Sequence, residues 1–323
     1  MASVAVIAPS NTMADLPKAL RANGVKRLGA MGYDVCFGRN ANLRAFHTAG
    51  SLSERLEDFR GAISDPDVTV ILPVFGGYNA NQLLPHIDYS KLAKFRKTIV
   101  GFSDTTALLI AIHKFAGTPA IHGPSFSVLC DPNAFDYTCH GFQCVLKQEQ
   151  VTYKSPVLVA DDAWYKKKDF GPREMRRFKG WNIYRRGEAR GPLIGGNLDT
   201  LSSLAGTQFF PNMKGCVLFL EDATGANPAV FHRQMTQLQQ MGVFNEIKGL
   251  LLGIPPRGSP LSSKGILCYI LNDVLGEVSY PVLLDVNCSH TDPMMSLPLG
   301  ATAYLVAGDS PCLHIEAYPE LRQ

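Results

Sequence analysis

Short apolar runs alternate with amphipathic stretches through the first half of the chain. Apolar runs bounded by turn residues predict strands, and stretches in which apolar residues recur at helical spacing predict helices. Ser51 or Ser53 is placed to cap the helix 53–63. The predicted strands are Val4–Ala8, Asp34–Phe37, Val68–Pro73 and Thr98–Phe102, and the predicted helices are Leu16–Met31, 53–63, Asn81–Leu84 and Asp104–Ala116.

This alternation of strand and helix predicts a parallel sheet covered by helices, of the Rossmann-like or flavodoxin-like kind. We assign it to an N-terminal α/β domain, residues 1–150. Ligands of such sheets bind beyond the carboxyl ends of the strands. Both the run Phe75–Asn79 and Ser103 follow such ends, so we expect the functional site there.

The pattern breaks in residues 151–190, which we interpret as a linker with a mobile loop. Residues 164–173 are polar, basic and aromatic. From residue 191 to 323 the alternation returns and predicts a smaller C-terminal α/β domain. Its predicted strands are Cys216–Leu220, Gly249–Ile254 and Val282–Asp285, and its predicted helices are 198–205, Pro228–Met241 and Ile266–Leu275.

Composition narrows the function classes. A length of 323 residues suggests about two domains. A net charge of +3 without a long basic run argues against a nucleic-acid polymer as partner. No apolar stretch approaches the ~20 residues of a membrane span, and the first residues lack the basic region of a signal peptide. We therefore expect a cytoplasmic protein whose eight cysteines are reduced.

The run Thr98–Leu109 joins an apolar strand directly to a serine and then to a helix. Gly101 lies two positions before Ser103, where a tight turn needs a residue without a side chain. Such a turn raises the serine hydroxyl above the sheet and points free helix N–H groups at it, which favours an oxyanion. The pattern is typical of a serine nucleophile on an elbow. A serine that only caps the helix has the same local sequence, so both interpretations remain open.

A serine nucleophile needs a base and a group that orients the base. His290 lies in the loop after the predicted strand Val282–Asp285, where strand ends present catalytic groups; a structural loop histidine is the alternative. Glu221 ends the apolar strand Cys216–Leu220. A carboxylate there should be paired or functional, because an unpaired buried charge is costly. Ser103, Glu221 and His290 are the candidate catalytic residues.

Six motifs, in order along almost the whole chain, give it a resemblance to a known family. They are Phe75–Tyr89 with its glycine pair, Gly101–Asp104, His122–Pro124, Gly191–Leu201, Leu220–Asp222 and Ser289–Gly300. With these motifs the chain resembles the L,D-carboxypeptidases of the S66 serine peptidase family. Asn79, Asn81 and the run Asp292–Met295 are more similar to the microcin C immunity protein (MccF-like) branch.

The resemblance implies a Ser–His–Glu triad in which Ser103 is the nucleophile, His290 the general base and then acid, and Glu221 the group that orients the imidazole. It also implies an oxyanion hole from the backbone N–H groups of Gly77 and Asp104, no cofactor or metal, and a homodimer. The expected substrate is a small molecule. The residues expected to contact it are Gly76, Tyr78, Asn79, Asn197 and Trp164.

Three functions are compatible with these residues. The first is hydrolysis of a terminal amide bond in a small peptidic or peptidyl-nucleotide substrate of the microcin C type. The second is removal of the terminal D-Ala from muropeptides during peptidoglycan recycling. The third is a non-catalytic binding protein on the same scaffold, because this chain has Ser289 where the family usually has glycine.

The loop at 160–190 has two interpretations. As a lid, it would bring Trp164 to stack on a nucleobase, and its basic residues would favour a phosphate or carboxylate. As a plain surface loop, its lysines would be solvated and Trp164 would lie outside the site. We expect Trp181 to pack beneath the linker. The basic residues are Lys166, Lys167, Lys168, Arg173, Arg176 and Arg177.

Overall fold

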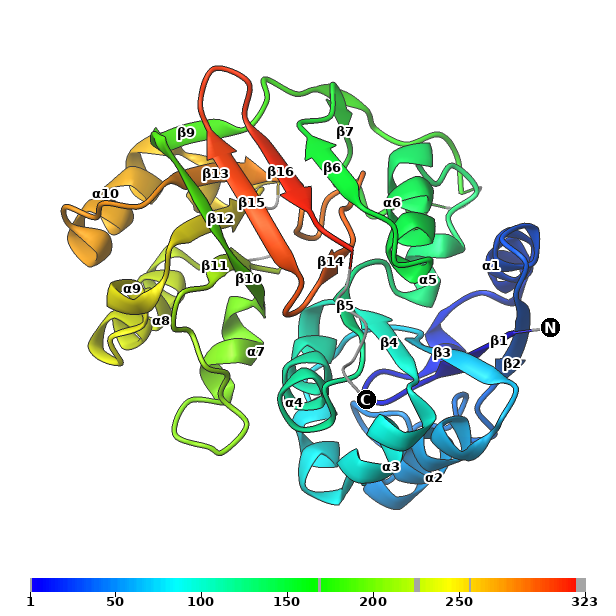
Figure 1. The fold of residues 1–323 in the computed structure, drawn as a ribbon. Coiled ribbons are helices and arrows are strands. Elements are labelled where there is room, and N and C mark those ends of the chain that lie inside the picture. Colours follow the sequence, from blue (N-terminus) through cyan, green and yellow to red (C-terminus); the bar gives the residue numbers. More distant parts are fainter. Residues whose placement is uncertain (1, 168–169, 224–226, 256, 318–323) are drawn as a thin grey trace.

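The apolar runs of the first half pair into one sheet. The structure is a computed structural model that describes residues 2–167, 170–223, 227–255 and 257–317. The sheet has the order β14-β5-β4-β3-β1-β2, with β1 to β5 parallel and β14 antiparallel to β5 (Figure 1). Its strands are β1 (Ser3–Ile7), β2 (Asp34–Phe37), β3 (Val68–Pro73), β4 (Thr98–Gly101), β5 (Ala120–His122) and β14 (Leu297–Pro298). The predicted parallel α/β architecture is confirmed.

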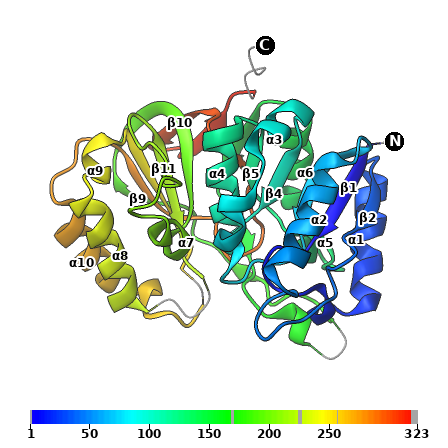
Figure 2. The same ribbon diagram turned by 90° about the horizontal axis from the view of Figure 1, so that it is seen from below.

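Helices cover both faces of this first sheet. Helices α2, α3 and α4 pack together on one face, and α1 packs with α5 on the other (Figure 2). Ser51, not Ser53, caps α2, through a capping box in which Glu54 accepts a hydrogen bond from the Ser51 backbone N–H. The helices are α1 (Lys18–Ala30), α2 (Leu52–Ser64), α3 (Tyr89–Phe95), α4 (Thr106–Ala116), α5 (Phe126–Leu129) and α6 (Asp136–Leu146), with 3₁₀ turns η1 (Met13–Asp15), η2 (Ala80–His86) and η3 (Ser103–Thr105).

The second half of the chain builds an eight-stranded sheet with the order β6-β16-β15-β10-β11-β12-β13-β9. Its centre, β10 to β13, is parallel, and the outer strands are antiparallel. The strands are β6 (Val151–Lys154), β9 (Asn182–Arg185), β10 (Gly187–Asn197), β11 (Val217–Glu221), β12 (Gly249–Gly253), β13 (Val282–Val286), β15 (Thr302–Ala307) and β16 (Cys312–Ile315). The helices are α7 (Leu198–Ser203), α8 (Pro228–Gln240), α9 (Val243–Glu246) and α10 (Lys264–Leu275), with η5 (Pro260–Ser262).

Residues 151–190, interpreted from the sequence as a linker with a loop, contribute strands β6 and β9 to this second sheet. Between them lie the two-stranded pair β7 (Leu158–Val159) and β8 (Arg176–Arg177), and η4 (Trp164–Lys166). The two sheets with their helices form two lobes side by side (Figure 2). The predicted domain boundaries stay a prediction.

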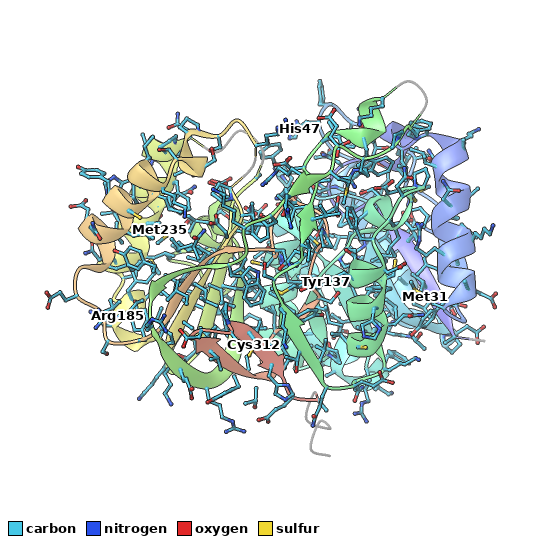
Figure 3. All side chains as sticks on the ribbon, turned by 90° about the horizontal axis from the view of Figure 1, so that it is seen from above. Met31, His47, Tyr137, Arg185, Met235 and Cys312 are labelled. Carbon is cyan, nitrogen blue, oxygen red and sulfur yellow. The ribbon has the colours of Figure 1, made fainter. Side chains whose placement is uncertain are left out.

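Strand pairing, helix packing and side-chain contacts join the lobes. Strand β14, from the C-terminal part of the chain, pairs with β5 of the first sheet (Figure 1). Tyr137 on α6, labelled in Figure 3, places its ring 5.7 Å from the ring of Tyr153 on β6. All eight cysteines are free. Within the described ranges, no helix combines the length and apolar character needed to cross a membrane.

Candidate active site

Ser103 lies at the carboxyl end of β4, on the sharp turn that leads into α4. Its φ of +59° is in the left-handed region, which costs a non-glycine residue about 1–3 kcal/mol and is found most often at functional sites. The turn fits only because its neighbours are small. A Cβ on Gly101 would lie 2.7 Å from the Thr105 Cγ2, and a Cβ on Gly76 would lie 2.9 Å from the Ser103 Cβ. The backbone therefore has the form of a nucleophile elbow.

The backbone at Gly76 and Gly77 runs beside the start of the elbow helix, since a Cβ on Gly76 would lie 3.3 Å from the Asp104 N. Gly77 has a φ of +153°, and a Cβ there would lie 2.2 Å from the Ser10 Oγ. That hydroxyl oxygen accepts hydrogen bonds from the next two backbone N–H groups, those of Tyr78 at 3.0 Å and Asn79 at 3.2 Å. Within the described part of the chain, no acceptor pairs with the N–H of Gly77 or of Asp104. An oxyanion hole requires such unused donors, so the expected role of these two groups stays a prediction.

A buried polar network holds these two turns together. The Asp104 carboxylate accepts a hydrogen bond from the Ala80 N–H at 2.9 Å. Burial raises the pKa of Asp104, and hydrogen bonds from Ser10 and from the backbone oppose that rise. The buried Arg55 guanidinium donates to the carbonyl oxygens of Pro9 and Asn79, at 2.9 and 3.2 Å. Ser10 and Arg55 are not predicted from the sequence, because neither lies in a pattern that indicates a site.

His290 and Glu221 meet across the second sheet. Glu221 ends β11 with a fully buried side chain, and its Oε2 lies 2.8 Å from the His290 Nδ1. Burial lowers the pKa of His290, but Glu221 and, to a lesser degree, Asp222 together raise it by more, so the pKa ends above its ordinary value. Burial raises the pKa of Glu221, and His290 brings it below its ordinary value. Because Nδ1 faces Glu221, Nε2 is left to exchange a proton with a nucleophile.

Asn197, at the end of β10, completes the support of Glu221. Its Nδ2 donates to the Glu221 Oε1 at 3.0 Å, and its Oδ1 accepts from the Thr200 N–H, which caps α7. Both ends of the amide are thus used within the protein. Its observed contacts orient the carboxylate that orients His290.

A pocket of about 590 Å³ brings the candidate residues together. Its lining includes Gly76, Gly77, Ser103, His290 and Trp164. Three other expected contacts, Tyr78, Asn79 and Asn197, lie outside this lining, and the Tyr78 side chain is 79% exposed. Their part in substrate binding stays a prediction.

Ser289, which differs from the family pattern, is accommodated without disturbing the pair. Its fully buried hydroxyl donates to the Ile254 carbonyl at 2.7 Å. The neighbouring Gly253 leaves the space that its side chain needs, since a Cβ on Gly253 would lie 2.9 Å from the Ser289 Cβ. The hydroxyl is thus satisfied by the strand behind it, and His290 keeps its hydrogen bond to Glu221.

Three of the six basic residues, Lys167, Arg173 and Arg176, pair with carboxylates of the protein, so they are neither plainly solvated nor held ready for a bound anion. Lys167 Nζ lies 2.8 Å from Asp162. Arg176 lies 3.4 Å from Asp161. Lys168 and the Lys166 side chain lie outside the described residues. Arg177, on β8, is exposed.

Arg173 is the most heavily engaged of these residues. Its side chain is 3% exposed and contacts Asp131 at 2.6 Å, Asp162 at 2.9 Å and Asp292 at 2.8 Å. The three carboxylates come from three separate segments of the chain. Arg173 therefore ties the loop to the segment that carries His290.

The two tryptophans differ in their surroundings. Trp181 is buried, and its Nε1–H donates to the Asn287 Oδ1 at 3.0 Å, in line with the expected packing role. Trp164 is also largely buried, but it borders the pocket. It is thus the tryptophan that a ligand in the pocket could reach.

Several known proteins are similar to this chain over most of its length. The Microcin C7 self-immunity protein MccF of Escherichia coli is 33% identical to this chain, over 86% of this chain and 82% of the length of MccF. The murein tetrapeptide carboxypeptidase of Pseudomonas aeruginosa is 30% identical over 94% of this chain and 92% of its own. Solved structures of MccF superpose closely: the complex with glutamyl sulfamoyl guanosine has a TM-score of 0.91 at 29% identity and covers 99% of this chain and 97% of that one.

Family models account for both halves of the chain. The LD-carboxypeptidase N-terminal domain matches residues 4–123, which include Gly77 and Ser103. The LD-carboxypeptidase C-terminal domain matches residues 190–305, which include Glu221 and His290. The chain therefore belongs to the S66 family of LD-carboxypeptidases, to which MccF is also similar, and is a peptidase.

Proposed function

We propose that the protein is a serine-type peptidase that hydrolyses a terminal amide bond in a small peptidic or peptidyl-nucleotide substrate. One observation carries the proposal. A histidine held at 2.8 Å by a fully buried glutamate borders the same pocket as a serine with a φ of +59°. This is the constellation that activates a serine hydroxyl.

The chemistry follows from the contacts. His290 Nε2 takes the proton of the Ser103 hydroxyl as its oxygen attacks the scissile carbonyl carbon. The N–H groups of Gly77 and Asp104 donate to the oxygen that becomes negative. His290 then protonates the leaving nitrogen, the C–N bond breaks, and an acyl-serine remains. Water, deprotonated by His290, hydrolyses that ester and regenerates Ser103. Glu221 stabilises the imidazolium in both steps.

The proposed substrate class is supported by relatives and by the pocket. MccF has been solved with glutamyl sulfamoyl guanosine, and a tryptophan-to-phenylalanine mutant of MccF with adenosine monophosphate. In this chain Trp164 borders the pocket that contains Ser103. We propose that Trp164 stacks on the base of a peptidyl-nucleotide substrate, a contact worth about 1–3 kcal/mol per base. We also retain the expectations of a homodimer and a cytoplasmic location.

The decisive experiment compares two substrates. The protein is incubated with an aminoacyl sulfamoyl adenosine and with a muropeptide tetrapeptide that ends in D-Ala, and products are identified by mass spectrometry. Cleavage of the sulfamoyl nucleoside supports the proposal. Cleavage of the muropeptide alone would overturn the nucleotide branch in favour of an L,D-carboxypeptidase.

A fluorophosphonate probe tests the serine chemistry without reference to substrate. The wild-type protein should label at Ser103, and Ser103→Ala should not. Absence of labelling in the wild-type protein would identify a binding protein rather than a serine peptidase.

A further inference from the structure

His122 is a fully buried residue that the proposed chemistry does not use. It ends β5, the strand where the two lobes meet. Its backbone pairs with Gly101 on one side, two residues before Ser103, and with Leu297 of β14 on the other. The residue therefore lies beneath the elbow and against the segment that comes back from the second lobe.

The side chain of His122 reaches the neighbours of all three candidate catalytic residues. Its Nε2 lies 2.8 Å from the carbonyl oxygen of Cys288, two residues before His290. Its ring packs edge-to-face at 5.0 Å on Phe219, two residues before Glu221. It also lies 6.3 Å, edge to face, from the ring of Phe102, which precedes Ser103.

The hydrogen bond fixes the protonation of this imidazole. A carbonyl oxygen only accepts, so Nε2 must carry the proton, and Nδ1 is the bare nitrogen. That Nδ1 is buried and has no hydrogen-bond partner among the residues that the structure describes. A second proton there would be a buried donor without an acceptor, which is costly.

Burial favours the same neutral form of His122 and outweighs the charge of Glu221. Burial lowers the pKa of His122, and His290 lowers it further, whereas Glu221 on β11 and the Cys288 carbonyl oppose this. Burial raises the pKa of the Cys288 thiol, which therefore stays uncharged. The balance leaves His122 below its ordinary pKa and neutral. A protonated His122 would compete with His290 for the electrostatic attraction of the Glu221 carboxylate.

We propose that His122 is a positioning residue: its neutral Nε2–H holds the Cys288 carbonyl and thereby sets the distance between His290 and Glu221. The inference rests on the proposed triad and adds a residue to it. Without the hydrogen bond, the segment 288–290 is anchored by fewer contacts, and His290 loses part of the stabilisation that raises its pKa. The buried Nε2–H donor of His122 thus influences both the position and the pKa of the general base, His290.

The test replaces His122 with two amide side chains of different length and with one aromatic ring that has no hydrogen-bond donor. His122→Gln can place its amide N–H near the position of Nε2, whereas His122→Asn is too short and His122→Phe has no donor. We expect His122→Asn and His122→Phe to lower kcat/KM by on the order of tenfold to a hundredfold, because small displacements of a base are that costly. KM should change little, and the acid limb of the pH profile should move to lower pH. His122→Gln should restore most of the rate and the wild-type acid limb.

Fluorophosphonate labelling at Ser103 provides a second readout that needs no substrate. It should slow in the same order, with His122→Asn and His122→Phe slower than His122→Gln. If His122→Phe fails to fold, the comparison of Gln with Asn decides. Equal losses in all variants with an unmoved acid limb, or wild-type labelling rates in His122→Asn, would overturn the proposal. Failure of the wild-type protein to label would instead overturn the triad itself.

Discussion

At the scale of single residues, the three candidate catalytic side chains should act as one unit. Ser103→Ala and His290→Ala should each remove nearly all turnover, and the double variant should be little worse than either, because each single change already abolishes the activated hydroxyl. Steady-state kinetics on the four proteins measures this. Additive losses in the double variant, or near-normal turnover in His290→Ala, would contradict the triad.

The pH profile reports the pairing of His290 with Glu221. A general base works when neutral, so activity should fall as pH drops through the His290 pKa. Because Glu221 raises that pKa above its ordinary value of about 6.5, the acid limb of kcat/KM should lie above it.

Glu221→Gln tests the source of this shift. Without the carboxylate, burial still lowers the His290 pKa and Asp222 still raises it, but the larger upward influence is gone, so the acid limb should move to lower pH. The rate should also fall, by about 10²- to 10⁴-fold, because the imidazolium loses its counter-charge. An acid limb that stays in place in Glu221→Gln would show that Glu221 does not set the pKa of His290.

The sequence pattern indicates catalytic candidates at the ends of apolar strands. It does not indicate the residues whose side chains hold those candidates in position. Ser103 and Glu221 could be selected because each directly ends a buried strand, and His290 because it follows one. Ser10 and Arg55 could not, since their partners, Tyr78 and Asp104 among them, are distant in sequence. Their roles depend on contacts that only the folded chain makes.

At the scale of elements, prediction worked where an element is long and periodic. The helix Pro228–Gln240 and the strand Val68–Pro73 lie close to their predicted bounds. Strand β5 has only three residues and gave no signal. Strand β10 lies in a stretch for which the sequence predicts no strand, because glycines at φ +154° and +145° interrupt its apolar pattern.

Arg173 should decide the stability of the loop that borders the pocket. Arg173→Met leaves Asp131, Asp162 and Asp292 without their shared cation. Removing one partner of a buried ion pair costs about 3–5 kcal/mol, so the free energy of unfolding should fall by that order. KM should rise as well, since Asp292 follows His290 by two residues and the loop carries Trp164.

Denaturant unfolding with a matched control measures this effect. Arg186 pairs with Asp309 at 2.9 Å, but both side chains are largely exposed, so Arg186→Met should cost less than about 1 kcal/mol. Similar losses in the two variants would show that the buried cluster is no stronger than a surface pair.

At the scale of the whole molecule, the connection between the two lobes includes a strand that crosses from one lobe into the sheet of the other. Strand β14 returns from the second lobe to cover the edge of β5, and β6, which follows α6 in the sequence, forms one edge of the second sheet. This pairing could not be deduced from the sequence, because Leu297–Pro298 is too short to show a period. It places β14, which follows the His290 segment, one strand away from β4, which leads into the elbow.

The crossing of β14 into the first sheet predicts that the lobes unfold together. Residues 1–150 alone would lack β14, so the polar edge of β5 and the apolar residues beneath it would be exposed. We therefore expect the full chain to unfold in a single calorimetric transition whose calorimetric and van't Hoff enthalpies agree. Leu297→Ala, at a fully buried position in β14, should lower the midpoint temperature of that single transition. The cavity that it creates should lower the free energy of unfolding by about 2–5 kcal/mol. As a control, Val157→Ser at a position that is 69% exposed should leave the free energy of unfolding within about 0.5 kcal/mol of the wild-type value. Two resolved transitions, or a Leu297→Ala effect confined to one of them, would mean that the lobes are independent and that the pairing of β14 with β5 does not couple them.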